Sequence, residues 1–248
     1  MAAAANDKSL QLHARLAGLL SLITMAAGIS ASFLVVDPLI VSGDAAATAT
    51  NILASEPLYR LGFAAKFVDY TFYLGVTVLL YGLLKPAGKS LSLLAAAFSF
   101  VGTAVVASTS LHYLAPLFFL GDAPYLAAFG TDQVQALAYL SHKLRGVGSD
   151  IAMVFFGLHL LFVGWLIARS TFLPRLLGVL SAIGGICFLI NSFAYFLSPP
   201  FAAQLPAYIF LPGILGQGLL ALWLLVMGVN VAKWKSQANA AVAELGAR

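Results

Sequence analysis

Long apolar runs separated by short polar segments make up most of the sequence. Each run is long enough for an α-helix to cross a hydrocarbon core of roughly 30 Å, which takes about 20 residues. None of them alternates apolar and polar residues as a barrel strand does, and a chain in lipid must satisfy its backbone amides within each segment. The pattern therefore predicts an all-α, polytopic membrane helix bundle. About six transmembrane helices are expected, at 14–36, 61–84, 90–118, 148–168, 172–198 and 207–232.

Two of the polar connections are predicted to form short surface helices on the extracytoplasmic side. The alanine-rich segment 45–55 follows Asp44, whose side chain can cap a helix. The segment 131–147 begins at Thr131, another capping residue, and places apolar residues at helical spacing with charges between them. Together these helices could form a lid over a cavity, or they could be ordinary connections packed on the bundle.

The composition agrees with a membrane protein that has a single transmembrane domain over residues 1–248. Hydrophobic residues make up 61% of the chain and charged residues 9%, whereas soluble domains contain about 25% charged residues. The mean hydropathy is +0.96. No soluble segment, long linker or internal repeat interrupts the apolar runs. Membrane lipids are therefore the expected partners.

The positions of lysine and arginine predict the orientation, because these residues resist translocation and collect on the cytoplasmic side. The favoured orientation is in the cell (inner) membrane with both termini in the cytoplasm. It gives a cytoplasmic set of Lys8, Arg15, Lys85, Lys89, Arg169, Arg175, Lys233, Lys235 and Arg248. The cations left outside are Arg60, Lys66, Lys143 and Arg145. Because the basic residues are scattered over many loops and form no stripe, no nucleic-acid partner is expected.

Several stretches of the chain together resemble the DUF4386 family of bacterial integral membrane proteins. They are GDAAATATNILASEPLYRLG (43–62), YGLLKP (81–86), FFGLHLLFVGWLIARSTFLPRLLGVL (155–180) and GQGLLALWLLVMG (216–228). The resemblance extends from Arg15 to about Gly228. It implies a multi-pass membrane protein, and it implies no activity, because the family label denotes a domain of unknown function.

Polar side chains inside the apolar runs are candidates for a site, since such groups are costly in hydrocarbon and often functional. Lys66 and Asp69 are three residues apart on one predicted helix, so they can pair with each other, and the lysine could also reach the outer interface. Asn191 and Gln217 could line a ligand site or could form hydrogen bonds that hold helices together.

His159 is the strongest candidate, because it lies in the middle of the apolar stretch FFGLHLLFVGW. A neutral imidazole needs both a hydrogen-bond donor and an acceptor around it. Gln217 is expected at a similar depth in the sixth run and is therefore the predicted neighbour. The imidazole could bind a ligand or handle a proton, or it could be a buried residue satisfied by Gln217, a tyrosine or a backbone carbonyl.

No metal or other cofactor is expected. Cys187 is the only cysteine, and no HExxH or paired-histidine spacing occurs on any run. Asp150 and His159 are nine residues apart, and at about 100° per residue they face opposite sides of a helix. A serine or cysteine nucleophile with an evident base is also missing from the sequence.

Three kinds of function remain open, and the oligomeric state is left open with them. The first is a bundle that binds or passes a small, mostly apolar molecule in a cavity lined by the polar candidates. The second is a structural or accessory membrane protein without a ligand. The third is an intramembrane enzyme that uses His159 as an acid or base. The sequence leans away from an enzyme, and no catalytic residue is assigned.

Overall fold

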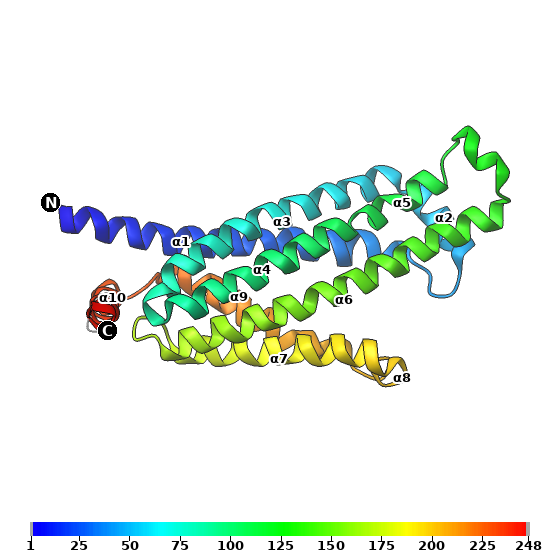
Figure 1. Ribbon diagram of the computed structural model, residues 1–248. Coiled ribbons are helices and arrows are strands. Elements are labelled where there is room, and N and C mark those ends of the chain that lie inside the picture. Colours follow the sequence, from blue (N-terminus) through cyan, green and yellow to red (C-terminus); the bar gives the residue numbers. More distant parts are fainter. Residues whose placement is uncertain (1, 247–248) are drawn as a thin grey trace. The chain divides into compact units, whose positions relative to one another are not determined.

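The computed structural model of the protein describes residues 2–246 (Figure 1). Side chains are described for residues 7–206 and 208–243, so Arg248, one of the cations predicted to be cytoplasmic, lies outside the described residues. Every regular element of the described chain is a helix. In chain order the elements are α1 (Ala2–Ile29), η1 (Ser30–Val36), η2 (Asp37–Leu39), α2 (Ala45–Ala54), α3 (Glu56–Leu84), η3 (Lys85–Ala87), α4 (Lys89–Thr109), α5 (Leu111–Phe119), η4 (Pro124–Ala128), α6 (Thr131–Arg169), α7 (Arg175–Leu197), α8 (Pro199–Ala202), η5 (Ala207–Phe210), α9 (Leu211–Val226) and α10 (Val231–Gly246).

Six helical stretches are long and apolar enough to cross a membrane, which confirms the predicted all-α polytopic architecture. Their apolar windows have mean hydropathies between 1.5 and 2.3. The stretches are Asp7–Leu39, Glu56–Ala87, Lys89–Phe119, Thr131–Arg169, Arg175–Leu197 and Tyr208–Val226.

The fourth of these stretches differs from the prediction, because the segment 131–147 is not a separate surface helix. It is the first part of α6, which continues without a break to Arg169. Gly146 and Gly148 do not end the helix, and Ser149 donates a hydrogen bond to the carbonyl of Arg145 within it. At 1.5 Å per residue a helix of 39 residues is about 58 Å long, roughly twice the thickness of a hydrocarbon core.

Two other boundaries follow from local chemistry. The predicted helix at 45–55 is present as α2, and the Asp44 side chain caps it by accepting a hydrogen bond from the Ala47 amide at 2.8 Å. The sixth span is shorter than predicted, because α9 ends at Val226 instead of continuing to residue 232. Gly228 has a φ of +68°, a left-handed conformation that stops the helix before α10 begins.

The chain forms two compact units. Unit 1 consists of residues 1–23, 72–103 and 152–248, and unit 2 consists of residues 24–71 and 104–151. Four of the long helices contribute residues to both units. The single domain expected over 1–248 stays a prediction.

Unit 1 is built around close helix crossings at glycine. Gly164 of α6 lies against Gly178 of α7. Seven residues away on each helix of this antiparallel pair, Gly157 lies against Gly185. On its other side α7 contacts α9, where Gly184 lies against Gly213 (Figure 1). Small residues allow this approach of backbones, as expected for helices packed in a membrane. The small-residue face of α7 that contains Gly178 and Gly185 therefore serves internal packing.

Two long-range contacts hold the region around the start of α10 in unit 1. The Gln11 side chain donates from Nε2 to the Val229 carbonyl at 2.7 Å and accepts from the Val229 amide at 3.2 Å. The indole of Trp234 donates to the Leu83 carbonyl at 2.8 Å. The first turns of α1 and the start of α10 are thereby held in the same unit.

Unit 2 has a smaller core in which two tyrosines form reciprocal hydrogen bonds. The Tyr59 hydroxyl donates to the Tyr113 carbonyl at 2.7 Å, and the Tyr113 hydroxyl donates to the Tyr59 carbonyl at 3.3 Å. Their ring centroids are 4.7 Å apart, and Val36 and Ile52 belong to the same buried cluster. This reciprocal arrangement links α3 to α5.

Candidate functional site

His159 is buried in unit 1, on the part of α6 that faces α4. Its Nδ1 atom lies 2.9 Å from the backbone carbonyl oxygen of Ala95. Because a carbonyl can only accept, Nδ1 carries the proton and donates it. In the neutral ring Nε2 is then an acceptor, and it takes no hydrogen bond from any residue that the structure describes.

The Tyr73 ring packs on His159, and a pair of hydroxyls lies one helical turn from the residues that contact the imidazole. The Tyr73 ring of α3 meets the imidazole edge-on at a centroid distance of 6.2 Å, and it meets Phe156 at 5.5 Å. One helical turn from Tyr73, the Thr77 hydroxyl donates to the Tyr73 carbonyl at 2.9 Å. The Ser99 hydroxyl lies 2.6 Å from Thr77 Oγ1, so Ser99 is the donor in that contact.

The sequence reasoning missed Tyr73, Thr77 and Ser99. Short hydroxyl side chains commonly bond back to their own helix, so each of them is unremarkable alone. The available signal was the spacing of four residues from Tyr73 to Thr77, which puts both on one face of the helix. Ala95 and Ser99 have the same spacing on α4. Helices α3, α4 and α6 thus bring their polar groups together in unit 1.

Gln217 is not the hydrogen-bond partner of His159, contrary to our expectation, because Ala95 supplies the only bond that the imidazole makes within the described residues. Gln217 is half-buried on α9, whose neighbouring Gly216 lies against the backbone of Leu180 on α7. The groups around His159 come instead from α3, α4 and α6. Asn191 is half-buried on α7 and has an interaction partner.

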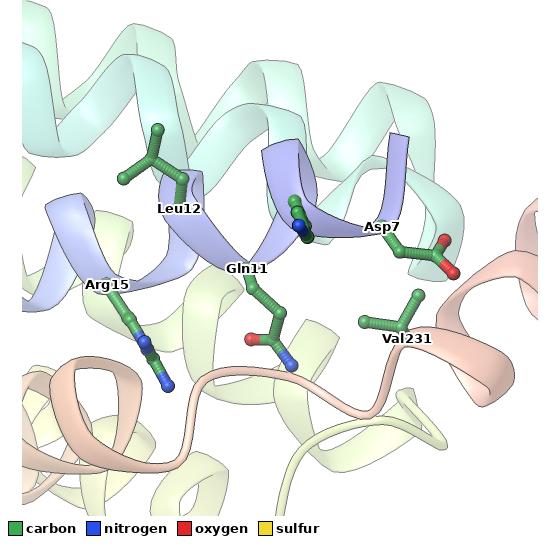
Figure 2. Close-up of a pocket in the computed structure, with 6 residues that line it drawn as sticks. Asp7, Gln11, Leu12, Arg15 and Val231 are labelled. Atoms are coloured by element: carbon green, nitrogen blue, oxygen red, sulfur yellow. The ribbon is translucent and has the colours of Figure 1, made fainter. Parts of the chain in front are cut away.

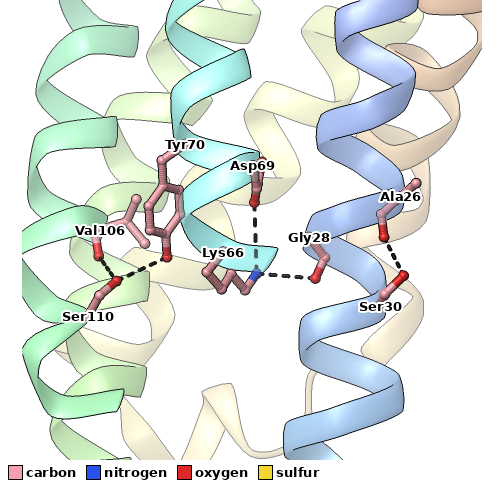
Figure 3. A network of polar contacts seen from close by, with 8 residues as sticks. All are labelled: Ala26, Gly28, Ser30, Lys66, Asp69, Tyr70, Val106 and Ser110. Carbon is pink, nitrogen blue, oxygen red and sulfur yellow. Dashed lines mark hydrogen bonds and ion pairs between the residues drawn. The ribbon is translucent and has the colours of Figure 1, made fainter. Parts of the chain in front are cut away.

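Lys66 and Asp69 lie in unit 2, where the predicted pair is present (Figure 3). Lys66 Nζ is 3.9 Å from Asp69 Oδ2, and it also donates a hydrogen bond to the Gly28 carbonyl at 3.2 Å. The ammonium group therefore bridges α3 and α1. A Cβ atom at Gly28 would lie 2.8 Å from Asp69 Oδ2, so glycine is what allows α1 to approach the carboxylate.

A second polar contact in unit 2 joins Tyr70 to Ser110 (Figure 3). Ser110 Oγ is 3.0 Å from the Val106 carbonyl and 3.3 Å from the Tyr70 hydroxyl. The serine hydroxyl is within donating distance of both oxygens, and the carbonyl of Val106 is the nearer acceptor. Ser110, which lies between α4 and α5, thereby contacts Tyr70 of α3.

Unit 2 also contains a hollow of about 270 Å³ between α2, the segment 119–129 and the start of α6. Leu53, Phe129, Thr131 and Gln135 are among the residues that line it. Its walls thus include parts of both segments, 45–55 and 131–147, that were considered as a lid. None of the five candidate residues lines this hollow.

No set of three or more His, Cys, Asp or Glu side chains is placed to hold a metal ion among the residues that the structure describes. Among the possible metal ligands, His142 and Asp150 belong to unit 2, whereas His159 belongs to unit 1. The Nδ1 atom of His142 is buried and has no hydrogen-bond partner in the described chain.

Replacing Asp69 by asparagine is expected to lower the free energy of unfolding by about 1–2 kcal/mol. Loss of one partner from a buried ion pair costs about 3–5 kcal/mol, and exposure of 15% for the Lys66 side chain and 20% for Asp69 reduces that figure. The double variant Lys66→Met/Asp69→Asn should lower the free energy of unfolding by less than the sum of the losses in Lys66→Met and Asp69→Asn, because no unpaired charge is left. Chemical denaturation in mixed micelles measures the two single variants and the double variant. Strictly additive losses would contradict a coupled pair.

Comparison with known proteins identifies similar chains without adding an activity. The family model described as "Domain of unknown function (DUF4386)" matches residues 16–228. A protein of Archaeoglobus fulgidus described as "Uncharacterized protein" is 29% identical over 160 residues, which cover 64% of this chain and 78% of that protein. No solved structure matches the chain.

Proposed function

Because the chain belongs to the DUF4386 family, whose description assigns no activity, we propose from its own residues that it binds or passes a small, mostly apolar molecule within the membrane bundle. We also propose that the protein lies in the inner membrane with both termini in the cytoplasm, since this orientation puts most cations on the cytoplasmic side. A ligand of this kind needs apolar surroundings and a few fixed polar groups.

The observation that carries the proposal is the hydrogen bonding of His159. Its Nδ1–H is committed to the Ala95 carbonyl, which fixes the ring and directs the acceptor Nε2 away from α4. The Tyr73 ring beside it, together with the Phe156 ring that packs against Tyr73, supplies apolar and aromatic contact surface. An apolar molecule with one hydroxyl group could donate to Nε2 and lie against these rings. His159 is therefore the group that we expect to distinguish hydroxylated from unsubstituted apolar ligands.

The test uses 1-naphthol, a small apolar phenol, and naphthalene, which lacks the hydroxyl. With full-length protein in lipid nanodiscs and ¹⁵N-labelled histidine, naphthol should shift the Nε2 resonance of His159, and naphthalene should leave it nearly unchanged. A hydrogen bond of about 1 kcal/mol corresponds to roughly five-fold weaker naphthol binding in His159→Leu. The matched control is His13→Leu, which replaces an exposed histidine of α1.

Other results would favour the alternatives. Naphthol binding that leaves the His159 resonance unchanged, or equal binding by His159→Leu, would contradict the proposal. Absence of saturable binding for both probes would favour a structural or accessory role, in which His159 serves only to hold α6 to α4. Turnover of a lipid that His159→Leu abolishes would instead favour the enzyme that uses His159 as an acid or base.

A further inference from the structure

The segments of unit 1 carry most of the positive charge of the chain. Their acidic residues in the sequence are Asp7 and Glu244. The basic residues are Lys8, Arg15, Lys85, Lys89, Arg169, Arg175, Lys233, Lys235 and Arg248. Such an excess attracts anions, and in a membrane protein the most abundant anions nearby are phospholipid headgroups.

A hollow of about 560 Å³ lies beside the first turns of α1 in this unit (Figure 2). Asp7, Lys8, Gln11, Leu12 and Arg15 line it from α1, and Val231 lines it from the start of α10. Asp7 forms an ion pair with Lys235, so its charge is already balanced. The two cations of the hollow, Lys8 and Arg15, are exposed and form no ion pair with any side chain that the structure describes.

Lys8 and Arg15 lie on one face of α1, which then becomes apolar. Residues 8, 12, 15 and 19 fall within about 60° of one another around a helix, at 100° per residue. Leu12 and Leu19, which complete this face, are both exposed. The face thus offers two cations about 10 Å apart along the helix axis, with an apolar strip leading from Arg15 into the long hydrophobic run.

The opposite wall of the hollow is held in place by hydrogen bonds. Gln11 bonds to both the carbonyl and the amide of Val229, and Figure 2 shows its side chain directed at the connection that leads into α10. Gly228, in its left-handed conformation, allows this approach, since a Cβ atom there would collide with Gln11 Oε1. Val231 therefore has a defined position relative to Lys8 and Arg15.

From this geometry we propose that the hollow binds the phosphate group of an anionic phospholipid between Lys8 and Arg15, with an acyl chain along Leu12 and Leu19. The apolar strip is the reason to assign the phosphate to a lipid instead of a soluble metabolite. A free phosphate would use the two cations and would gain nothing from the exposed leucines. The proposal is independent of the ligand proposed for His159.

The experiment measures lipid binding to the full chain in detergent by native mass spectrometry, with dioleoyl-phosphatidylglycerol and dioleoyl-phosphatidylcholine as probes. Phosphatidylglycerol should bind more tightly than phosphatidylcholine. The variant Lys8→Gln/Arg15→Gln should bind phosphatidylglycerol about 30-fold more weakly, since each cation near an anionic headgroup contributes about 1 kcal/mol. The matched control Lys89→Gln/Arg175→Gln removes two exposed cations of unit 1 that do not line the hollow, and it should bind as the wild type does.

Two results would overturn the proposal. Equal phosphatidylglycerol binding by the Lys8→Gln/Arg15→Gln variant and its control would show that the attraction comes from general charge and not from this hollow. Displacement of phosphatidylglycerol by glycerol 3-phosphate at a similar concentration would show that the site recognises a soluble phosphate. Failure of millimolar glycerol 3-phosphate to compete, together with the selective loss in the first variant, would support the lipid assignment.

Discussion

Tyr59→Ala is expected to lower the free energy of unfolding by about 3–5 kcal/mol, the usual cost of removing a large buried ring. Tyr59 is 2% exposed, and its ring, its hydroxyl and its backbone carbonyl all contact Tyr113. The substitution therefore removes both the packing and the 2.7 Å hydrogen bond that join α3 to α5. Chemical denaturation of the purified protein in mixed micelles measures the loss.

Two companion variants separate these contributions. Tyr59→Phe keeps the ring and loses only the hydroxyl, so it should cost about 1 kcal/mol. Tyr125→Ala removes a tyrosine of the same unit that is 66% exposed and should change the free energy of unfolding by no more than about 0.5 kcal/mol. A loss in Tyr59→Ala as small as that in Tyr125→Ala would refute the role of the tyrosine pair in unit 2.

Gly164→Ala is expected to destabilise the protein by about 1–3 kcal/mol, although it adds a single methyl group. The added Cβ would lie 2.5 Å from the Gly178 carbonyl oxygen and 2.7 Å from the Ala182 amide nitrogen. Both neighbours are backbone atoms, which cannot move aside as the end of a flexible side chain can. The antiparallel helices α6 and α7 must therefore separate, and this would also loosen the crossing at Gly157 and Gly185.

Gly82→Ala is the matched control for this change. Gly82 lies within α3 in the same unit, and a Cβ atom there would meet nothing within 4 Å. Because alanine favours helix more than glycine does, this variant should be neutral or more stable by about 0.5–1 kcal/mol. Thermal denaturation of both variants in the same detergent gives the comparison. Equal melting temperatures for Gly164→Ala and Gly82→Ala would show that the crossing tolerates a methyl group.

The apolar runs predicted the number and type of the long helices, because in lipid length and hydropathy alone decide which segments can span. The cap at Asp44 likewise predicted the start of α2, and the helix ends at Ala54, one residue before the predicted end. The continuity of α6 was missed, since an amphipathic spacing over 131–147 looks the same in a separate surface helix and in the extension of a span. The sequence has no proline near residue 148 that would show whether the helix ends there or continues.

For the candidate residues, the sequence indicated which side chains take part in buried polar contacts, but it did not identify all of their partners. The spacing of Lys66 and Asp69 predicted their pairing, but the third member of that contact is the carbonyl of Gly28. The partner of His159 is likewise a carbonyl, that of Ala95. Every residue has a backbone carbonyl, so neither partner leaves a signal in the sequence. Gln217 was predicted as a partner from its depth, and depth does not specify which helices are neighbours.

The hydrogen bonds between Gln11 and Val229 have a consequence for biosynthesis. They join residues 218 positions apart, so α1 cannot acquire these partners until Val229 has left the ribosome, long after α1 itself. Until then the amide side chain of Gln11 must be satisfied by water or lipid headgroups. Unit 1 is thus completed late, after the membrane insertion of the helices that lie between these residues in the chain, and a ribosome stalled before Val229 would hold α1 without its final contact.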